Sequence, residues 1–253
     1  MKKQAETTKR RVPWFGALVV VVLAATALMA LVIAPPDAQQ GNAQRLMYLH
    51  VPSAWVAYLA FAATAIASVL WLVPRTRSTS WDLLAGASAE VGVVFTGLML
   101  VVGSIWGKPI WGSWWEWDAR LTTTAVLFFL YLGYLALRRA GGSPDQRAKR
   151  SAIAALVAFV DVPIVHFSVN WFETLHQQGT VFNRKLGEAE IGGTMAATLV
   201  LSVVAFTLLY CYLVMRRMEL LALEEGFEER ELALAIEERI AQETPEPVVS
   251  VPS

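Results

Sequence analysis

Six long apolar stretches constrain the fold of this chain more than any other feature. Each is close to the roughly 20 residues that a helix needs to cross the hydrocarbon core of a bilayer. They cover residues 14–34, 53–73, 83–105, 121–138, 152–170 and 191–215. The chain is 56% hydrophobic and only 17% charged, whereas soluble domains are about half apolar and a quarter charged. The sequence therefore predicts an all-α integral membrane protein with six transmembrane helices in a lipid bilayer.

The distribution of positive charge predicts the orientation of these helices. Most of the 21 Lys and Arg residues lie in four segments, namely 2–11, 74–82, 138–151 and the part of the chain after 215. Because cytoplasmic loops carry an excess of Lys and Arg, we expect both termini in the cytoplasm. Three segments then face outwards, at 35–52, 106–120 and 171–190, and we expect short helices on this outer face to carry the functional site. The first apolar run exceeds the ~7–15 residues of a signal peptide, which favours an uncleaved first helix.

The chain divides into a six-helix membrane domain, residues 1–215, and an acidic cytoplasmic helical tail, residues 216–253. Apolar residues in the tail are loosely spaced as a stripe among glutamates, at Leu220, Leu223, Phe227, Leu234 and Ile240. Pro245 and Pro247 are expected to end the helix. Two interpretations of the tail stay open: a solvated helix, or a docking helix for a partner.

The segment "WGSWWEWD", residues 111–118, holds four Trp and two carboxylates within eight residues. An interfacial aromatic belt needs fewer Trp per helix end and no interleaved acids. Read as a helix, Trp111, Trp114, Trp115 and Asp118 share one face, and Trp117 points elsewhere. Such a group of indoles at the membrane surface would form a platform for a large flat apolar ligand, such as a porphyrin.

The three histidines of the chain are all predicted to lie towards the outer face, at His50, His166 and His176. Two neutral imidazoles that face each other are a natural axial pair for haem iron, and we predict this role for His50 and His176. With Glu173 the same pair could instead form a zinc site, although zinc would not explain the tryptophans.

Cations near the site would bind the two propionates of a porphyrin. Arg45 lies about 7.5 Å of helical rise before His50 if that segment is helical, and Arg120 follows the Trp cluster. A guanidinium can bind a carboxylate through two parallel hydrogen bonds. Weaker candidates are Lys108, Arg184 and Lys185.

Other polar residues within the spans receive structural interpretations. We expect His166 to be a satisfied membrane histidine near the interface, and Glu90 and Asp161 to make polar contacts with another helix or a partner. Neither acid has an obvious basic mate in the neighbouring spans. The single cysteine, Cys211, excludes an internal disulfide, and without a Cys-x-x-Cys-His motif the chain cannot itself carry covalently attached c-type haem.

Three motifs resemble those of one family of haem-handling membrane proteins. "WGKPIWGSWWEWDARLT", residues 106–122, is similar to the tryptophan-rich signature W-G-x-x-W-x-W-D (the WWD motif) and fills each of its fixed places. "MYLHVPSAW" (47–55) and "PIVHFSVNWFETLHQ" (163–177) resemble the segments that carry the two histidines of the family. The similarity runs from about residue 14 to 215 and is strongest to the haem exporter protein C (CcmC) family of cytochrome c maturation.

This resemblance implies a specific function. Members of the family hold haem b transiently and non-covalently at the outer face of the bacterial inner membrane, with axial ligands that correspond to His50 and His176. They present it to a periplasmic haem chaperone, CcmE. The implied partners are the small membrane subunit CcmD and the ABC transporter subunits CcmA and CcmB, with no nucleic acid. The chain lacks a P-loop motif, so ATP hydrolysis would belong to a partner and the chain is not expected to be an enzyme.

Three other classes of protein fit the sequence less well. A larger cytochrome c synthetase of the same superfamily would have more spans and more histidines. A b-type haem electron-transfer subunit would carry its histidine pairs inside adjacent helices. A haem permease or channel subunit of an ABC transporter complex would line a path with polar residues, whereas these spans are mostly Val, Leu and Ala.

Overall fold

The fold is an all-α bundle, as the sequence predicts. The computed structural model describes residues 2–176 and 193–243, with side chains from residue 14 onwards except at 241. Of the residues that the structure describes, 85% are helical. Six helical segments are long and apolar enough to cross a membrane, at Trp14–Ile33, Asn42–Leu72, Thr79–Trp111, Ala119–Arg139, Pro144–Trp171 and Gly193–Ile240. These segments match the six predicted spans in order.

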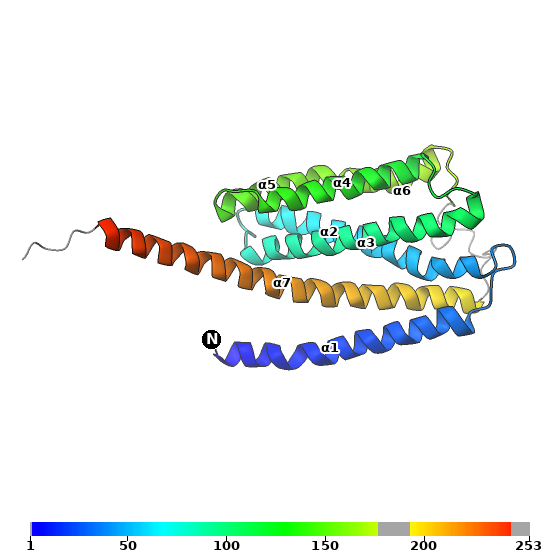
Figure 1. Ribbon diagram of the computed structural model, residues 1–253, viewed down its shortest axis with the longest axis horizontal. Coiled ribbons are helices and arrows are strands. Elements are labelled where there is room, and N and C mark those ends of the chain that lie inside the picture. The colour runs from blue at the N-terminus through cyan, green and yellow to red at the C-terminus, as the bar shows by residue number, and fades with distance from the viewer. Residues whose placement is uncertain (1, 177–192, 244–253) are drawn as a thin grey trace, which may run out of the picture.

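The helices run alongside one another in a bundle with two distinct ends (Figure 1). In chain order they are α1 (Lys2–Leu28), a π-helical turn η1 (Met29–Ile33), a 3₁₀ turn η2 (Asn42–Leu46), α2 (Met47–Leu72), α3 (Thr79–Trp111), α4 (Ala119–Arg139), α5 (Pro144–Phe159), α6 (Asp161–Trp171) and α7 (Gly193–Glu243). The start of α1 lies at the end from which α7 projects, and the connections after η1, α3 and α6 gather at the opposite end.

Local sequence signals set several of the helix boundaries. The side chains of Ser78 and Asp118 accept hydrogen bonds from the first turns of α3 and α4, which satisfies backbone N–H groups that have no partner within the helix. Ser143 and Gln146 form a capping box at the start of α5. Gly112 ends α3 with a φ of 81°, a left-handed conformation that favours glycine.

The fifth predicted span, residues 152–170, consists of two helices rather than one. α5 ends at Phe159 and α6 begins at Asp161. Pro163 lies in the first turn of α6 and has no N–H to donate to the carbonyl four residues earlier. This missing hydrogen bond accounts for the interruption, which a pattern of apolar residues alone does not reveal.

Small residues allow the central helices to approach closely. A Cβ atom at Gly92 of α3 would lie only 2.7 Å from the ring of Phe61 on α2. Phe61 stacks in turn on Tyr131 of α4, with ring centres 3.7 Å apart. The hydroxyl groups of Ser88 and Tyr210 lie 2.7 Å apart and join α3 to α7. These contacts form a packed centre that holds both ends of the bundle in place.

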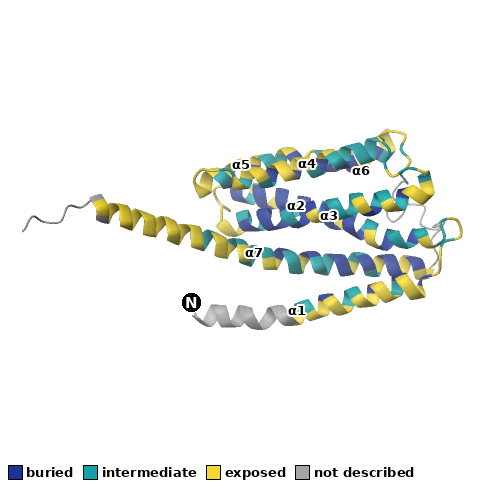
Figure 2. Ribbon diagram, viewed as in Figure 1, coloured by how far each residue is buried: buried dark blue, intermediate teal, exposed yellow. Residues whose placement is uncertain are grey.

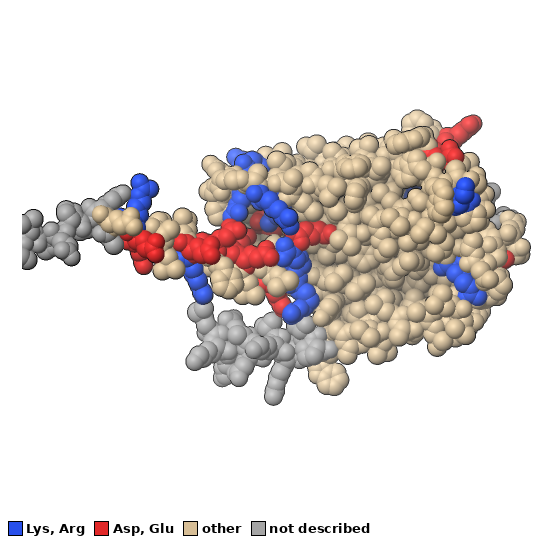
Figure 3. All heavy atoms as spheres, in the orientation of Figure 1, with Lys and Arg blue, Asp and Glu red and all other residues tan. Residues whose placement is uncertain are grey.

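Helix α7 combines the sixth predicted span and most of the predicted tail. Its 51 residues correspond to a length of about 76 Å, and it continues well beyond the other helices (Figures 1 and 2). The predicted end of this helix at Pro245 and Pro247 lies outside the described residues. Charged side chains concentrate where α7 leaves the bundle, whereas the middle of the visible face is uncharged (Figure 3), as expected for a surface that contacts lipid.

Candidate functional site

The structure brings His50 and His176 together at the end opposite the α7 projection. His50 lies in the first turn of α2, and His176 lies in the non-helical segment after α6. Their ring centres are 6.2 Å apart. A metal–imidazole bond is about 2 Å and the ring centre lies about 1 Å beyond the nitrogen, so two axial imidazoles on one metal have centres roughly 6 Å apart. The observed spacing is therefore compatible with a shared iron.

The environment of His50 determines which of its nitrogens can act as a ligand. Nδ1 lies 3.0 Å from the backbone oxygen of Met99. A carbonyl oxygen can only accept, so Nδ1 carries the proton and donates it in this hydrogen bond. Nε2 is then unprotonated, with its lone pair available for a metal. The backbone of α3 thus holds the imidazole in the tautomer that an iron ligand requires.

Three residues of α3 support His50, and the sequence analysis did not identify them as part of the site. Besides Met99, a Cβ atom at Gly103 would lie 2.8 Å from Cε1 of His50, so glycine makes room for the ring. Trp106 packs edge-on against the imidazole, with centres 5.8 Å apart. Met99, Gly103 and Trp106 follow the four- and three-residue spacing of one helix face, a signal that was present in the sequence.

The loop between η1 and η2 fixes the position of Trp106. Its indole Nε1 donates a hydrogen bond to Oε1 of Gln40, at 3.0 Å. The Asp37 carboxylate accepts hydrogen bonds from the backbone N–H groups of Gln40 and Gln39, at 2.7 and 2.9 Å. These donors stabilise the ionised form and lower the pKa of the Asp37 carboxyl. The loop therefore supports His50 indirectly, because it holds the indole of Trp106 that packs on the imidazole.

The Trp-rich segment is not helical, so the expectation that its indoles share one helix face is wrong. α3 ends at Trp111, and residues 112–118 are irregular. The reason is local: the left-handed Gly112 ends one helix, and Asp118 begins the next as its N-cap. A short helix does precede the second span: η2 begins at Asn42 and leads into the first turn of α2, which carries His50.

The four tryptophans of this segment occupy two kinds of environment. Trp111 is half-buried, and its ring centre lies 6.4 Å from that of His176. Trp115 is half-buried and meets Trp117 edge to face at 5.5 Å. Trp114 and Trp117 expose 59% and 79% of their surfaces. One part of the cluster thus packs beside the histidine pair, and the other part is open to its surroundings.

Asp118 positions the segment that carries His176. Its Oδ1 accepts a hydrogen bond from the backbone N–H of Leu121 at 2.8 Å, which caps α4. Its Oδ2 accepts one from the N–H of Leu175 at 3.3 Å, one residue before His176. The tryptophan-rich motif predicts a ligand-binding role for Asp118, whereas its contacts in the structure position the start of α4 and the segment before His176.

The two arginines proposed for propionates occupy different environments. Arg45 donates from Nε to Asn42 at 3.0 Å and from Nη1 to the backbone oxygen of Ala30, so it already joins η2 to η1. Arg120 lies half-buried in the first turn of α4, within electrostatic range of His50. It is the better placed of the two for an anionic group beside the histidines.

Of the three weaker cation candidates, only Lys108 lies in the described part of the chain. Lys108 donates a hydrogen bond to the backbone oxygen of Gly112 at 2.8 Å, and its Nζ lies 5.9 Å from the ring centre of Trp114. It therefore supports the turn that ends α3. Arg184 and Lys185 lie outside the described residues.

Two buried polar groups in the Trp-rich segment have no hydrogen-bond partner among the described residues, namely Nε1 of Trp115 and Oγ of Ser113. An unsatisfied buried donor costs about 1–3 kcal/mol. Both groups are suited to donate to a carboxylate of a ligand bound at this end.

His166 and the intramembrane acids lie away from the histidine pair. His166 is exposed on α6, with its ring centre 6.1 Å from that of Tyr58. Glu90 pairs with Arg217 of α7, Nη2 to Oε1 at 3.1 Å, which is the polar contact with another helix that we expect for this residue. Arg217 lies in the predicted tail and meets Glu90 only through packing of α3 against α7. Oδ2 of Asp161 is buried without a partner among the described residues.

The zinc alternative receives no support from the described part of the chain. No group of three or more His, Cys, Asp or Glu side chains within it could hold a metal ion. Cys211 is exposed and forms no disulfide, in agreement with its interpretation as a small apolar residue of a span.

These features define a class of protein: a six-helix membrane protein that presents a histidine pair and a cluster of indoles at one end. A family model described as "Heme exporter protein C" matches residues 2–233. Proteins named "Heme exporter protein C" are 41% identical in Bradyrhizobium diazoefficiens (203 residues, 80% of this chain and 75% of the relative) and 43% identical in Haemophilus influenzae (211 residues, 83% and 84%). The Escherichia coli K12 protein of that name is 40% identical over 212 residues, 84% of each chain.

The chain belongs to the haem exporter protein C family. It is therefore a multi-pass membrane protein of cytochrome c biogenesis that handles haem, and this family is not a known enzyme. The family name also indicates membership of a haem exporter complex. The resemblance recognised from the three sequence motifs is confirmed.

Proposed function

We propose that this chain holds haem between His50 and His176 and presents it to the haem chaperone CcmE. The observation that carries the proposal is the histidine pair itself. The ring centres lie 6.2 Å apart, and the hydrogen bond to Met99 leaves Nε2 of His50 free to ligate iron. Haem b would be bound transiently and without a covalent bond, since the chain has no Cys-x-x-Cys-His motif.

The surroundings of the pair suit a porphyrin. Trp106 and Trp111 pack against the two imidazoles and would provide apolar walls for the disc. Arg120 and the unpaired Nε1 of Trp115 would bind the propionates. Arg45 is a secondary candidate, because two of its N–H groups already bind protein oxygens. With both axial positions filled, the iron would be shielded from oxygen during transfer.

The exposed indoles support a role in presenting haem to a partner protein rather than in storing it. Trp114 and Trp117 are large apolar side chains that remain mostly exposed beside the histidine end. Aromatic residues are enriched at protein–protein contacts, and these two would contact CcmE while one edge of the haem stays accessible. The proposed partners within the membrane are CcmD, CcmA and CcmB, with ATP hydrolysis assigned to the transporter subunits.

The charge distribution supports an orientation for the complex. The basic connections 74–82 and 138–151 lie at the end from which α7 projects, and such segments favour the cytoplasmic side. The histidine end would then face the periplasm at the outer side of the bacterial inner membrane, where CcmE could reach it.

An absorption spectrum of the detergent-purified full-length protein, made in cells that produce haem, tests the proposal. We expect a six-coordinate low-spin haem spectrum for the wild type. His50→Ala and His176→Ala should each lose most of the haem or convert it to a five-coordinate form, because one axial ligand is removed. His166→Ala is the matched control, since this exposed imidazole packs on Tyr58, and it should retain the wild-type spectrum.

Two results would overturn the ligand assignment. One is an equal loss of haem in all three histidine variants, and the other is full retention in both His50→Ala and His176→Ala. Covalent haem on co-expressed CcmE, measured by haem staining, separates holding from presentation. Trp117→Ala should lower this loading and leave the spectrum of the chain unchanged.

A further inference from the structure

The part of α7 that projects beyond the bundle exposes apolar side chains that the described chain does not cover. Every residue from Phe227 to Ile240 is exposed (Figure 2). Phe227, Leu232, Leu234 and Ile236 expose between 50% and 63% of their surfaces. We call residues 227–240 the α7 extension. Removal of apolar surface from water is favourable, so a partner that covered several of these side chains would bind more tightly.

Acidic residues surround these apolar side chains. The α7 extension contains five glutamates and two arginines, at Glu228, Glu229, Glu231, Glu237, Glu238, Arg230 and Arg239. Figure 3 shows the acidic side chains along the root and length of this helix. The surface is therefore both apolar and negatively charged, which selects for a partner with apolar and basic side chains.

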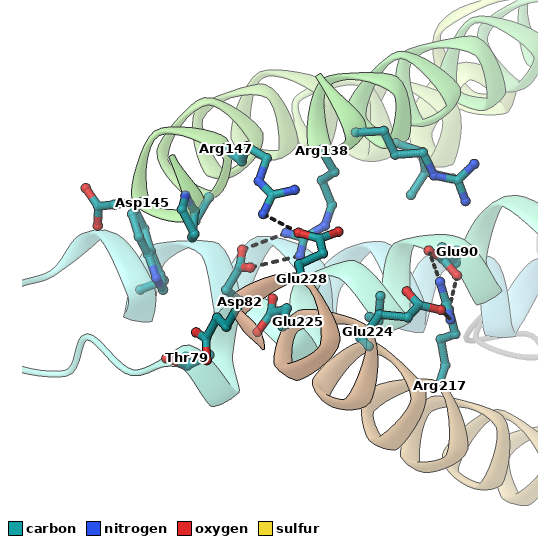
Figure 4. A pocket seen from close by; sticks show the side chains of 17 residues that line it. Thr79, Asp82, Glu90, Arg138, Asp145, Arg147, Arg217, Glu224, Glu225 and Glu228 are labelled. Atoms are coloured by element: carbon teal, nitrogen blue, oxygen red, sulfur yellow. Dashed lines mark hydrogen bonds and ion pairs between the residues drawn. The ribbon is translucent and has the colours of Figure 1, made fainter. Parts of the chain in front are cut away.

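The root of the α7 extension is fixed to the bundle. Arg147 of α5 binds Glu228 at 3.0 Å, and Arg217 binds both Glu90 of α3 and, at 2.8 Å, Glu224. These ion pairs line a cavity of about 520 Å³ between α7 and the ends of α3, α4 and α5 (Figure 4). The direction in which the helix leaves the bundle is thus set by the fold.

That direction carries the α7 extension away from the bilayer. It continues along the long axis of the bundle (Figure 1), and the 51 residues of α7 cover about 76 Å, whereas a bilayer with its headgroups is about 40–45 Å thick. Anionic lipid headgroups would also repel its glutamates. A second copy of the same helix would place glutamates opposite glutamates, which is unfavourable.

We infer that the α7 extension is a docking site for a basic, amphipathic helical segment of another protein, on the side of the membrane opposite the histidine pair. Phe227 and Leu234, seven residues apart on one helix face, would bind the apolar face of that segment. Glu231 and Glu238, beside them on that face, would bind its Lys and Arg residues, as in heteromeric coiled coils. This inference does not depend on how haem is bound at the other end.

Site-specific photo-cross-linking of the full-length protein in intact cells tests this inference. The photoreactive residue p-benzoylphenylalanine is placed at position 234 and, as a control, at position 21 on α1, because Leu234 and Val21 are similarly exposed, at 59% and 65%. We expect position 234 to cross-link to a protein through a peptide of net positive charge. Position 21 should not give this adduct.

Charge reversal distinguishes the proposed contact from a chance encounter. Glu231→Lys with Glu238→Lys should lower the yield of the adduct at position 234 several-fold, because like charges would then face each other. Glu231→Asp with Glu238→Asp keeps both charges and should keep the yield. Circular dichroism of the purified variants checks that α7 remains helical.

Four results would overturn the inference: an adduct with a second copy of this chain, an adduct with lipid, an adduct through an acidic or uncharged peptide, or no adduct at position 234. If the charge-reversed variant does not fold, the test rests on the adduct formed at position 234 in the chain with its native glutamates, and on the net charge of the cross-linked peptide. Haem content is measured separately, so a failure here is distinguishable from a failure of the haem proposal.

Discussion

The two ends of the bundle are built from different interactions. At the end where α7 projects, six ion pairs join residues that the structure describes. At the histidine end, aromatic rings pack on imidazoles, backbone groups bind side chains, and the indoles of Trp114 and Trp117 remain exposed. Paired charges fix helices relative to one another. Exposed rings and the indole N–H of Trp115, which has no partner among the described residues, are instead able to bind another molecule.

The strongest of these ion pairs shows how the α7 end is fixed. Arg138 of α4 binds Asp82 of α3 through two hydrogen bonds, at 2.6 and 2.8 Å. Their side chains are only 15% and 14% exposed. A Cβ atom at Gly86 would lie 2.8 Å from the guanidinium, so glycine leaves the space through which Arg138 reaches its partner. The pair is specific in geometry and nearly buried.

The largest expected effect of a single substitution is that of Arg138→Ala. It leaves the Asp82 carboxylate nearly buried without its partner, which typically costs 3–5 kcal/mol, about 4 kcal/mol at the centre of that range. Chemical unfolding of the purified protein in detergent measures the loss. Asp82→Ala combined with Arg138→Ala should restore part of it. A double variant less stable than Arg138→Ala would contradict the role of this pair.

A smaller effect is expected at the opposite end from Gly103→Ala. The new Cβ atom would lie 2.8 Å from Cε1 and 3.1 Å from Nδ1 of His50, and such overpacking typically costs about 1–3 kcal/mol. The imidazole must shift away from Met99, so haem retention should fall in the absorption spectrum. Gly133→Ala is the matched control, since no side chain and no other part of the fold lies within 4 Å of its Cβ position. Unchanged haem retention in Gly103→Ala would show that the position of this ring is not critical.

Asp118→Ala should cost less stability and still affect the site. Loss of the N-cap of α4 destabilises by about 1 kcal/mol, and loss of the contact with Leu175 frees the segment that carries His176. We expect weaker haem retention, measured by titration with haem. Asp118→Asn keeps an acceptor oxygen and should lie between the alanine variant and the wild type. If Asp118→Ala binds haem as the wild type does, this contact has no positioning role.

The smallest effect is expected from Glu219→Ala. Glu219 pairs with Arg216 three residues earlier, and both side chains are well exposed, at 37% and 45%. Exposed pairs of this kind contribute about 0.3–0.5 kcal/mol. Chemical unfolding should therefore show almost no change. A loss as large as that of Arg138→Ala would mean that burial is not what separates strong from weak ion pairs at this end.

The comparison also shows which parts of the site could be found from sequence. His50 and His176 were identified because the chain has only three histidines and because the predicted topology brought them to one face. Their supporting residues, Met99, Gly103 and Trp106, were missed although they follow helical spacing. Apolar and small residues on a span are common, and only the packing of α3 against α2 distinguishes these three.

The sequence by itself determined the six spans, the family and the residue types at the histidine end. These properties depend on hydrophobicity along about 20 residues and on motifs a few residues long, both of which can be read locally. It also determined that a helix continues after the last span, because apolar and acidic residues alternate there without an early breaker.

Only the tertiary structure decided how distant segments meet. The partnership of Glu90 with Arg217 and the hydrogen bond from His50 to Met99 both join parts of the chain that are far apart in the sequence. Side-chain partners of this kind are chosen by the packing of whole helices against one another, through ridges, grooves and small residues. Local propensity does not contain that information, which is why the residues that support the two histidines appear only in the folded bundle.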